Sequence, residues 1–131
     1  MADEKSKKTN ILLVEDDKFL AGMYVAKLDL EGFKVNFAND GEKGLKSAIE
    51  EKPDIILLDI ILPKMSGFDV IKNLKDNPQT KDIPVVLLTN LGQRDDVQKG
   101  LDLGAEDYLI KAHFMPSEVV AKIKKIIESK K

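Results

Sequence analysis

The stretch that decides the fold is residues 54–63, which read Asp54-Ile55-Ile56-Leu57-Leu58-Asp59-Ile60-Ile61-Leu62-Pro63. The uncharged run from Ile55 to Leu58 ends abruptly at an acid, and Pro63 and Gly67 follow it. A short apolar run bounded by polar and turn residues is typical of a strand buried on both faces. A carboxylate beside apolar neighbours is costly unless a cation or hydrogen bonds compensate it. We therefore expect a central strand to deliver Asp59 to the rim of a sheet, where other polar groups meet it.

The composition narrows the class of protein. The 131 residues fit one domain, and 43% hydrophobic with 34% charged residues is an ordinary balance for a globular chain. A formal net charge of −2 provides no basic excess for phosphate-backbone contacts, which argues against nucleic-acid binding. The absence of cysteine excludes disulfides and thiolate chemistry. No apolar run is long enough to span a membrane and residues 1–8 lack a signal core, so we expect a cytoplasmic protein without membrane contacts.

Apolar runs alternate with helical patterns along the whole chain. The predicted strands are residues 11–14, 33–37, 55–58, 85–88 and 108–110, with 33–37 nearer a sheet edge. The predicted helices begin near Asp17, Asp40, Ser66, Arg94 and Pro116, the first three residues serving as caps. In the helix over 94–103 we expect Val97 and Leu101 to face the core. This alternation predicts an α/β fold, a parallel sheet covered by helices on both faces.

Functional groups follow four of the five predicted strands. Glu15 and Asp16 follow the first, Asp59 the third, Thr89 the fourth and Lys111 the fifth. Right-handed crossovers bring the carboxyl ends of all strands to one rim, where ligands of open sheets bind. Three carboxylates there repel unless a cation joins them, and an all-oxygen site suits Mg²⁺. A carboxylate can attack phosphorus while Mg²⁺, an ammonium and a hydroxyl stabilise the phosphoryl oxygens, so the pattern predicts reversible phosphorylation of an aspartate.

These residues and their neighbours resemble the receiver domains of two-component response regulators. The resemblance covers roughly residues 10–128 and implies a flavodoxin-like, doubly wound sheet of five parallel strands in order 2-1-3-4-5, with five helices. Residues 1–9 are then a charged N-terminal tail and 129–131 a C-terminal tail. Five motifs in this order carry the resemblance: Leu13-Val14-Glu15-Asp16, Leu57-Leu58-Asp59, Leu62-Pro63-Lys64-Met65-Ser66-Gly67, Leu87-Leu88-Thr89 and Asp107-Tyr108-Leu109-Ile110-Lys111.

The resemblance also implies a role for each acid and for the lysine. Asp59 matches the phosphoacceptor, which takes a phosphoryl group from a sensor histidine kinase, a phosphotransfer protein or a small phosphodonor. Glu15 and Asp16 match the acidic pair that holds Mg²⁺ with Asp59, and the backbone carbonyl of Ile61 is a further ligand. Lys111 matches the ion-pair partner of the phosphoacceptor.

The remaining motif residues imply a switch. Thr89 matches the hydroxyl that moves towards the phosphoryl group. Tyr108 matches the aromatic residue that couples Thr89 to a partner-binding face formed by the fourth helix, fifth strand and fifth helix. Since only residues 128–131 follow the last predicted helix, we expect a single-domain receiver that docks to an output partner rather than acting as an enzyme.

Two departures from the family pattern affect the site. Ala112 follows the lysine where the family usually has proline, which leaves either a trans bond or an enforced cis bond between Lys111 and Ala112. Asn90 follows Thr89 where a smaller residue is common. Ile61 and Leu91 flank the predicted site, and because neither side chain can orient a water molecule we expect slow self-dephosphorylation.

Four other functions compete with the switch. The chain could pass its phosphoryl group onward as a phosphorelay intermediate. A Mg²⁺-dependent phosphohydrolase needs a second acid near the nucleophile, and Ile61 stands two residues beyond Asp59. A flavin carrier needs a phosphate-binding loop after the first strand, where residues 15–17 are all acidic. A degenerate receiver that works without phosphorylation is disfavoured by the complete set of motif residues.

Overall fold

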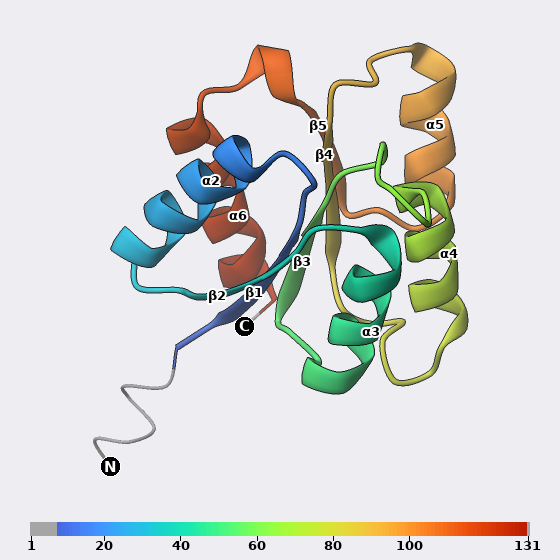
Figure 1. The fold of residues 1–131 in the computed structure, drawn as a ribbon, viewed down its shortest axis with the longest axis horizontal. Helices are drawn as coiled ribbons and strands as arrows, with labels where there is room; N and C mark the ends of the chain where they lie inside the picture. The colour runs from blue at the N-terminus through green and yellow to red at the C-terminus, as the bar shows by residue number, and fades with distance from the viewer. Residues whose placement is uncertain (1–7, 131) are drawn as a thin grey trace.

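A computed structural model describes residues 8–130 of the chain. Most of the expected N-terminal tail, and residue 131 of the expected C-terminal tail, lie outside these residues. Strands and helices alternate as predicted (Figure 1). The elements are β1 (Asn10–Val14), α2 (Lys18–Leu30), β2 (Lys34–Ala38), α3 (Gly41–Glu51), β3 (Ile55–Leu58), α4 (Gly67–Asp76), β4 (Val85–Thr89), α5 (Arg94–Asp102), β5 (Asp107–Ile110), the 3₁₀ helix η1 (Lys111–His113) and α6 (Pro116–Ser129).

The five strands form one parallel sheet in the order β2-β1-β3-β4-β5, so the expected topology is confirmed. β2 lies at an edge, and β3 lies at the centre with residues 55–58 completely buried. Helices α2 and α6 cover one face of the sheet, while α3, α4 and α5 cover the other (Figure 1). Because successive strand side chains point to opposite faces, Ile11 and Leu13 join the core under α2 and α6, and Leu12 and Val14 join the other core.

The predicted caps are present at three helix starts. The Asp17 carboxylate accepts hydrogen bonds from the backbone N–H groups of Phe19 and Leu20. Asp40 and Ser66 accept the corresponding bonds at α3 and α4. These side chains satisfy backbone donors that have no partner within the helix, which fixes where each helix begins after its strand.

The prediction for the inward face of α5 is wrong at Leu101, which is 43% exposed. The buried residue of α5 is Gly100. A Cβ atom at this glycine would lie 2.6 Å from Leu87 Cδ1 and 2.9 Å from Tyr108 Cδ2, so α5 rests on the sheet through its own backbone. This close approach turns Leu101 outward, and Leu103 packs against the core instead.

Two further findings concern the chain path and its surroundings. Residues 8–130 contain no cis peptide bond, so the bond between Lys111 and Ala112 is trans. Over the same residues, no helix combines the length and the apolar character needed to cross a lipid bilayer.

Candidate functional site

The register of the sheet places two acids side by side at its carboxyl end. Val14, the last residue of β1, pairs with Leu58, the last residue of β3. The backbone N–H of Asp59 donates to Val14 O at 3.0 Å and that of Glu15 donates to Ala38 O at 3.0 Å, which extends the ladders by one residue beyond the strands. Glu15 and Asp59 therefore leave adjacent strands at the same level, and both are buried, at 2% and 6% exposed.

Lys111 joins these two acids from the end of β5. Its ammonium Nζ lies 2.6 Å from Glu15 Oε1 and 2.8 Å from Asp59 Oδ2. Burial lowers the pKa of Lys111, but the hydrogen bonds to Asp59 and Glu15 outweigh burial and raise this pKa above its usual value. Burial raises the pKa of Glu15 despite opposing hydrogen bonds from Lys111 and the Asp17 N–H. One cation thus makes it possible to bury two carboxylates together.

The loop after β3 holds the Asp59 carboxylate from its other side. Asp59 Oδ1 accepts from the backbone N–H of Ile60 at 2.6 Å and, more weakly, from that of Ile61 at 3.4 Å. The loop then folds back, and the N–H of Gly67 donates to Ile60 O at 2.8 Å. A side chain at residue 67 would collide with the Asp59 carbonyl, so glycine is required for this close approach.

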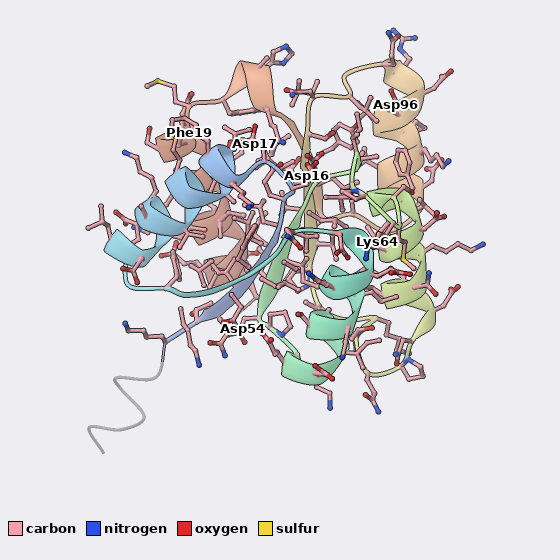
Figure 2. All side chains as sticks on the ribbon, in the orientation of Figure 1. Asp16, Asp17, Phe19, Asp54, Lys64 and Asp96 are labelled. Carbon is pink, nitrogen blue, oxygen red and sulfur yellow. The ribbon has the colours of Figure 1, made fainter. Side chains whose placement is uncertain are left out.

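The acids form a cluster suited to a hard cation. Glu15, Asp16 and Asp59 each offer a carboxylate oxygen, and these atoms lie within 4.8 Å of one another. Asp16 is exposed at the sheet rim, where Figure 2 labels it beside Asp17. An all-oxygen set that is partly open to solvent matches the preference of Mg²⁺, which keeps several of its waters. The donor chemistry therefore fits a divalent cation.

A pocket of about 260 Å³ opens over these groups. Its lining consists of Glu15, Asp16, Asp17, Leu20, Asp59, Ile61, Thr89, Asn90 and Lys111. Lys111 is the one cationic side chain in this lining, so an anionic phosphoryl group that enters the pocket would meet it and any bound metal ion.

Thr89 and Tyr108 meet at the backbone of a single loop residue. Thr89 ends β4 and is completely buried, and its Oγ1 accepts a hydrogen bond from Leu91 N–H at 3.3 Å. The Tyr108 hydroxyl donates to the Leu91 carbonyl at 2.6 Å. Burial, with smaller effects of Asp96 and Asp59, raises the pKa of Tyr108 to about 12, so the hydroxyl remains a donor well above neutral pH. A movement of Thr89 would thus reach Tyr108 through Leu91.

The structure brings the predicted site residues together. The side chains of Glu15, Asp16, Asp59, Thr89 and Lys111 line one pocket with Ile61, while Tyr108 connects to it through Leu91. Sequence reasoning missed three contributors: the Asp17 N–H that holds Glu15, the Leu20 side chain in the lining, and the Leu91 backbone. The position of Leu20, one turn into a helix that starts at the rim, was a usable signal. The Asp17 N–H and the Leu91 backbone could not have been found in this way, because backbone groups do not depend on which side chain the residue carries.

Comparisons with known proteins agree with this geometry. The family model described as the response regulator receiver domain matches residues 11–124. The DNA-binding dual master transcriptional regulator RpaA of Synechocystis sp. is 40% identical over 117 residues, which cover 89% of this chain and 48% of RpaA. The phosphate regulon transcriptional regulatory protein PhoB of Escherichia coli is 43% identical over 117 residues, covering 89% and 51%. The chain thus spans about half the length of these curated relatives.

A solved structure has the same fold. The BeF₃-activated N-terminal receiver domain of Klebsiella pneumoniae RstA superimposes with a TM-score of 0.82 at 30% sequence identity, covering 91% of this chain and 98% of that one.

Proposed function

This chain belongs to the response regulator receiver domain family, and from that premise we propose that it is a signalling switch whose phosphoacceptor is Asp59. One observation supports the choice most strongly. Asp59 shares Lys111, the three-carboxylate cluster and the pocket with Glu15, but Asp59 alone follows the central strand β3, and its second carboxylate oxygen is oriented by the backbone N–H of Ile60. The phosphodonor would be a sensor histidine kinase, a phosphotransfer protein or a small acyl phosphate.

The transfer makes one bond and breaks one bond. An Asp59 carboxylate oxygen attacks phosphorus, and the bond from phosphorus to the donor nitrogen or oxygen breaks, so the donor leaves with that electron pair. Glu15, Asp16, Asp59 and the Ile61 carbonyl would hold Mg²⁺, which supplies positive charge to the phosphoryl oxygens when bound. Lys111 already lies 2.8 Å from Asp59 Oδ2 and can pair with the incoming phosphoryl oxygens.

Phosphorylation would then change the contacts of Thr89. Its hydroxyl, which now accepts from Leu91 N–H, can rotate to donate to a phosphoryl oxygen. The Leu91 peptide is also bonded to Tyr108, so its displacement would shift the β4–α5 loop and the face of α5, β5 and α6. A phosphoryl group needs to bias such an equilibrium by only about a few kcal/mol. We propose that an output partner docks on this face.

Two related functions differ in what happens to the phosphoryl group. A phosphorelay intermediate would pass it to a histidine on another protein, whereas a switch would retain it until hydrolysis. Ile61, 60% exposed beside the pocket, has no group that could protonate a leaving group or orient a water molecule. We therefore propose slow self-dephosphorylation and no turnover of phosphomonoesters. A phosphoryl half-life of seconds would contradict this proposal.

Intact mass spectrometry after incubation with acetyl phosphate and Mg²⁺ tests the proposal. Wild type should gain one phosphoryl group, and Asp59→Asn should gain none. Asp54→Asn is the matched control, because Asp54 precedes the same strand at the opposite end of the sheet and should leave the mass gain unchanged (Figure 2). Chelation of Mg²⁺ should abolish the gain. A mass gain that persists in Asp59→Asn would move the phosphoacceptor elsewhere.

A further inference from the structure

The helix α2 is apolar on the face that points away from the core. Its buried residues are Ala21, Tyr24 and Leu28. On the opposite side, Phe19 is 77% exposed and Leu30 is 83% exposed. A surface helix normally presents polar residues to water, as α6 does with its lysines, so this outer face of α2 lacks the usual solvated surface.

The outer face has the form of a straight stripe. Phe19, Met23, Ala26 and Leu30 recur at intervals of four, three and four residues. At 3.6 residues per turn these four positions fall within roughly 60° of one another around the helix. A stripe of this kind buries apolar area when a second helix packs along it. Figure 2 labels Phe19 near the outward start of α2.

The stripe is complementary to itself. Because the intervals read the same in both directions, two antiparallel copies related by a twofold axis place Phe19 against Leu30 of the second copy. The same axis places Met23 against Ala26 of the second copy. A twofold interface requires this kind of match, in which one patch meets itself in reverse.

The charges beside the stripe also match in this arrangement. Lys18 and Asp29 are exposed on the same flank of α2, and within residues 8–130 neither forms an ion pair. In the antiparallel arrangement Lys18 of each copy lies beside Asp29 of the other, which gives two equivalent pairs of opposite charge. In a parallel twofold arrangement the flanks of the two copies would lie on opposite sides of the interface, and neither Lys18 nor Asp29 would meet a charged partner from this flank.

We propose that the outer face of α2 is an interface with a second copy of this chain, packed antiparallel about a twofold axis. Its functional consequence rests on the proposed function. Asp17, the N-cap of α2, and Leu20, in its first turn, line the pocket over Asp59. A second copy on α2 therefore covers the approach of a protein phosphodonor, while a small acyl phosphate can still enter.

Sedimentation velocity over a concentration series tests the interface. We expect a weak dimer with a dissociation constant on the order of 10–100 μM, because one helix face is a small interface. Phe19→Glu should raise this constant at least tenfold. Met115→Glu is the matched control, since Met115 is 66% exposed but lies outside α2, and it should change the constant less than twofold.

A charge swap tests the orientation. Lys18→Asp and Asp29→Lys should each weaken the dimer about threefold or more, and the double variant should return to within twofold of wild type. A double variant that is weaker than either single variant would overturn the antiparallel arrangement. Neither residue lines the pocket over Asp59, so all three variants should still be phosphorylated by acetyl phosphate.

Other outcomes separate this proposal from the proposed function. A wild-type chain that remains monomeric to about 1 mM, or a Phe19→Glu chain that dimerises like wild type, overturns the interface. If the chain is monomeric and Phe19→Glu slows transfer from a histidine kinase but not from acetyl phosphate, the stripe binds the phosphodonor. This result also overturns the proposed interface. Loss of phosphorylation by acetyl phosphate in wild type would instead refute the proposed function, whatever the oligomeric state.

Discussion

A lysine is held at each end of the sheet, and the two lysines have opposite kinds of partner. At the carboxyl end, Lys111 bonds to the carboxylates of Glu15 and Asp59. Near the amino end of β4, Lys75 donates to the backbone carbonyls of Lys81 at 3.0 Å and Ile83 at 2.8 Å. The pKa of Lys111 is raised because carboxylates outweigh burial, whereas burial lowers the pKa of Lys75, which has only neutral acceptors.

The two kinds of partner indicate different roles for the two lysines, one in phosphoryl transfer and one in holding the fold. The Asp59 carboxylate can bind another cation in place of Lys111, and Lys111 can bind a phosphoryl oxygen in place of the carboxylate. The contacts of Lys111 can therefore be rearranged during a reaction. Backbone carbonyls are fixed by the fold, and Lys75 closes the connection between α4 and β4 in one geometry. Substitution of Lys111 should therefore impair phosphorylation, whereas substitution of Lys75 should lower stability and leave phosphorylation nearly unchanged.

The largest effect is expected at Lys111. Replacement by Met removes the cation from the pocket lining and should slow phosphorylation by acetyl phosphate about 100-fold or more, because a charged donor to the phosphoryl oxygens is lost. The rate follows from intact mass against time with saturating Mg²⁺. Lys75→Met is the control and should phosphorylate within twofold of wild type. Equal slowing by the two substitutions would remove the distinction between the two ends.

The next effect concerns the lifetime of the phosphoryl group. Ile61→Glu places a carboxylate beside the pocket, where it can orient a water molecule for attack on phosphorus. We expect the half-life of phosphorylated protein to shorten by roughly tenfold or more. Decay of the phosphorylated mass after removal of the donor measures it. Leu101→Glu, which adds the same charge at an exposed site on α5, should leave the half-life unchanged.

At the amino end, Lys75→Met should lower the free energy of unfolding by about 1–2 kcal/mol at pH 7, because two carbonyls lose a donor. The pKa of Lys75 is lowered in the folded state from 10.5, so its contribution to stability is complete above pH 10.5 and declines as pH falls through the folded pKa. The difference in free energy of unfolding between wild type and variant, measured by urea unfolding, should therefore be larger at pH 10 than at pH 7. A smaller difference at pH 10 would mean that the carbonyl contacts to the ammonium outweigh burial, which would contradict the lowered pKa of Lys75.

Substitution of Thr89 should change stability and phosphorylation least, but it should weaken the response of α5 to phosphorylation. Thr89→Val keeps the volume but removes the hydroxyl that meets Leu91 N–H, so the protein should accept a phosphoryl group while amide chemical shifts in α5 respond less. Thr80→Val is the matched buried control, since Thr80 Oγ1 donates to Leu74 O at 2.7 Å away from the site. It should cost about 1–2 kcal/mol of stability and leave the α5 response intact.

The carboxyl end of the sheet was predictable from sequence for a physical reason. A run as short as residues 55–58, bounded by polar and turn residues, favours a buried strand over a helix, and parallel strands bring whatever follows them to one rim. The acids, Thr89 and Lys111 were therefore located without knowledge of any distance. The family resemblance implied that Lys111 pairs with Asp59, but nothing in the sequence indicated that the same ammonium also pairs with Glu15.

The failures occur where backbone geometry or the outer surface decides. Leu101 follows the helical pattern but is exposed, because Gly100 brings α5 close to Tyr108. The Lys75 contacts involve two backbone carbonyls, and these contacts cannot be predicted from the identity of the residues that provide them. The stripe through Phe19 and Leu30 was hidden in an apolar helix whose buried side cannot be distinguished by composition alone.

The most direct test of the central claim is to locate the phosphoryl group chemically. Borohydride reduces an aspartyl phosphate to homoserine, and peptide sequencing by mass spectrometry then identifies the residue. After reaction with acetyl phosphate and Mg²⁺, homoserine should stand at position 59 and at no other aspartate. Homoserine at Asp16 or Asp17, or none at all in a protein that has gained phosphoryl mass, would contradict the convergence of Glu15, Thr89 and Lys111 on Asp59.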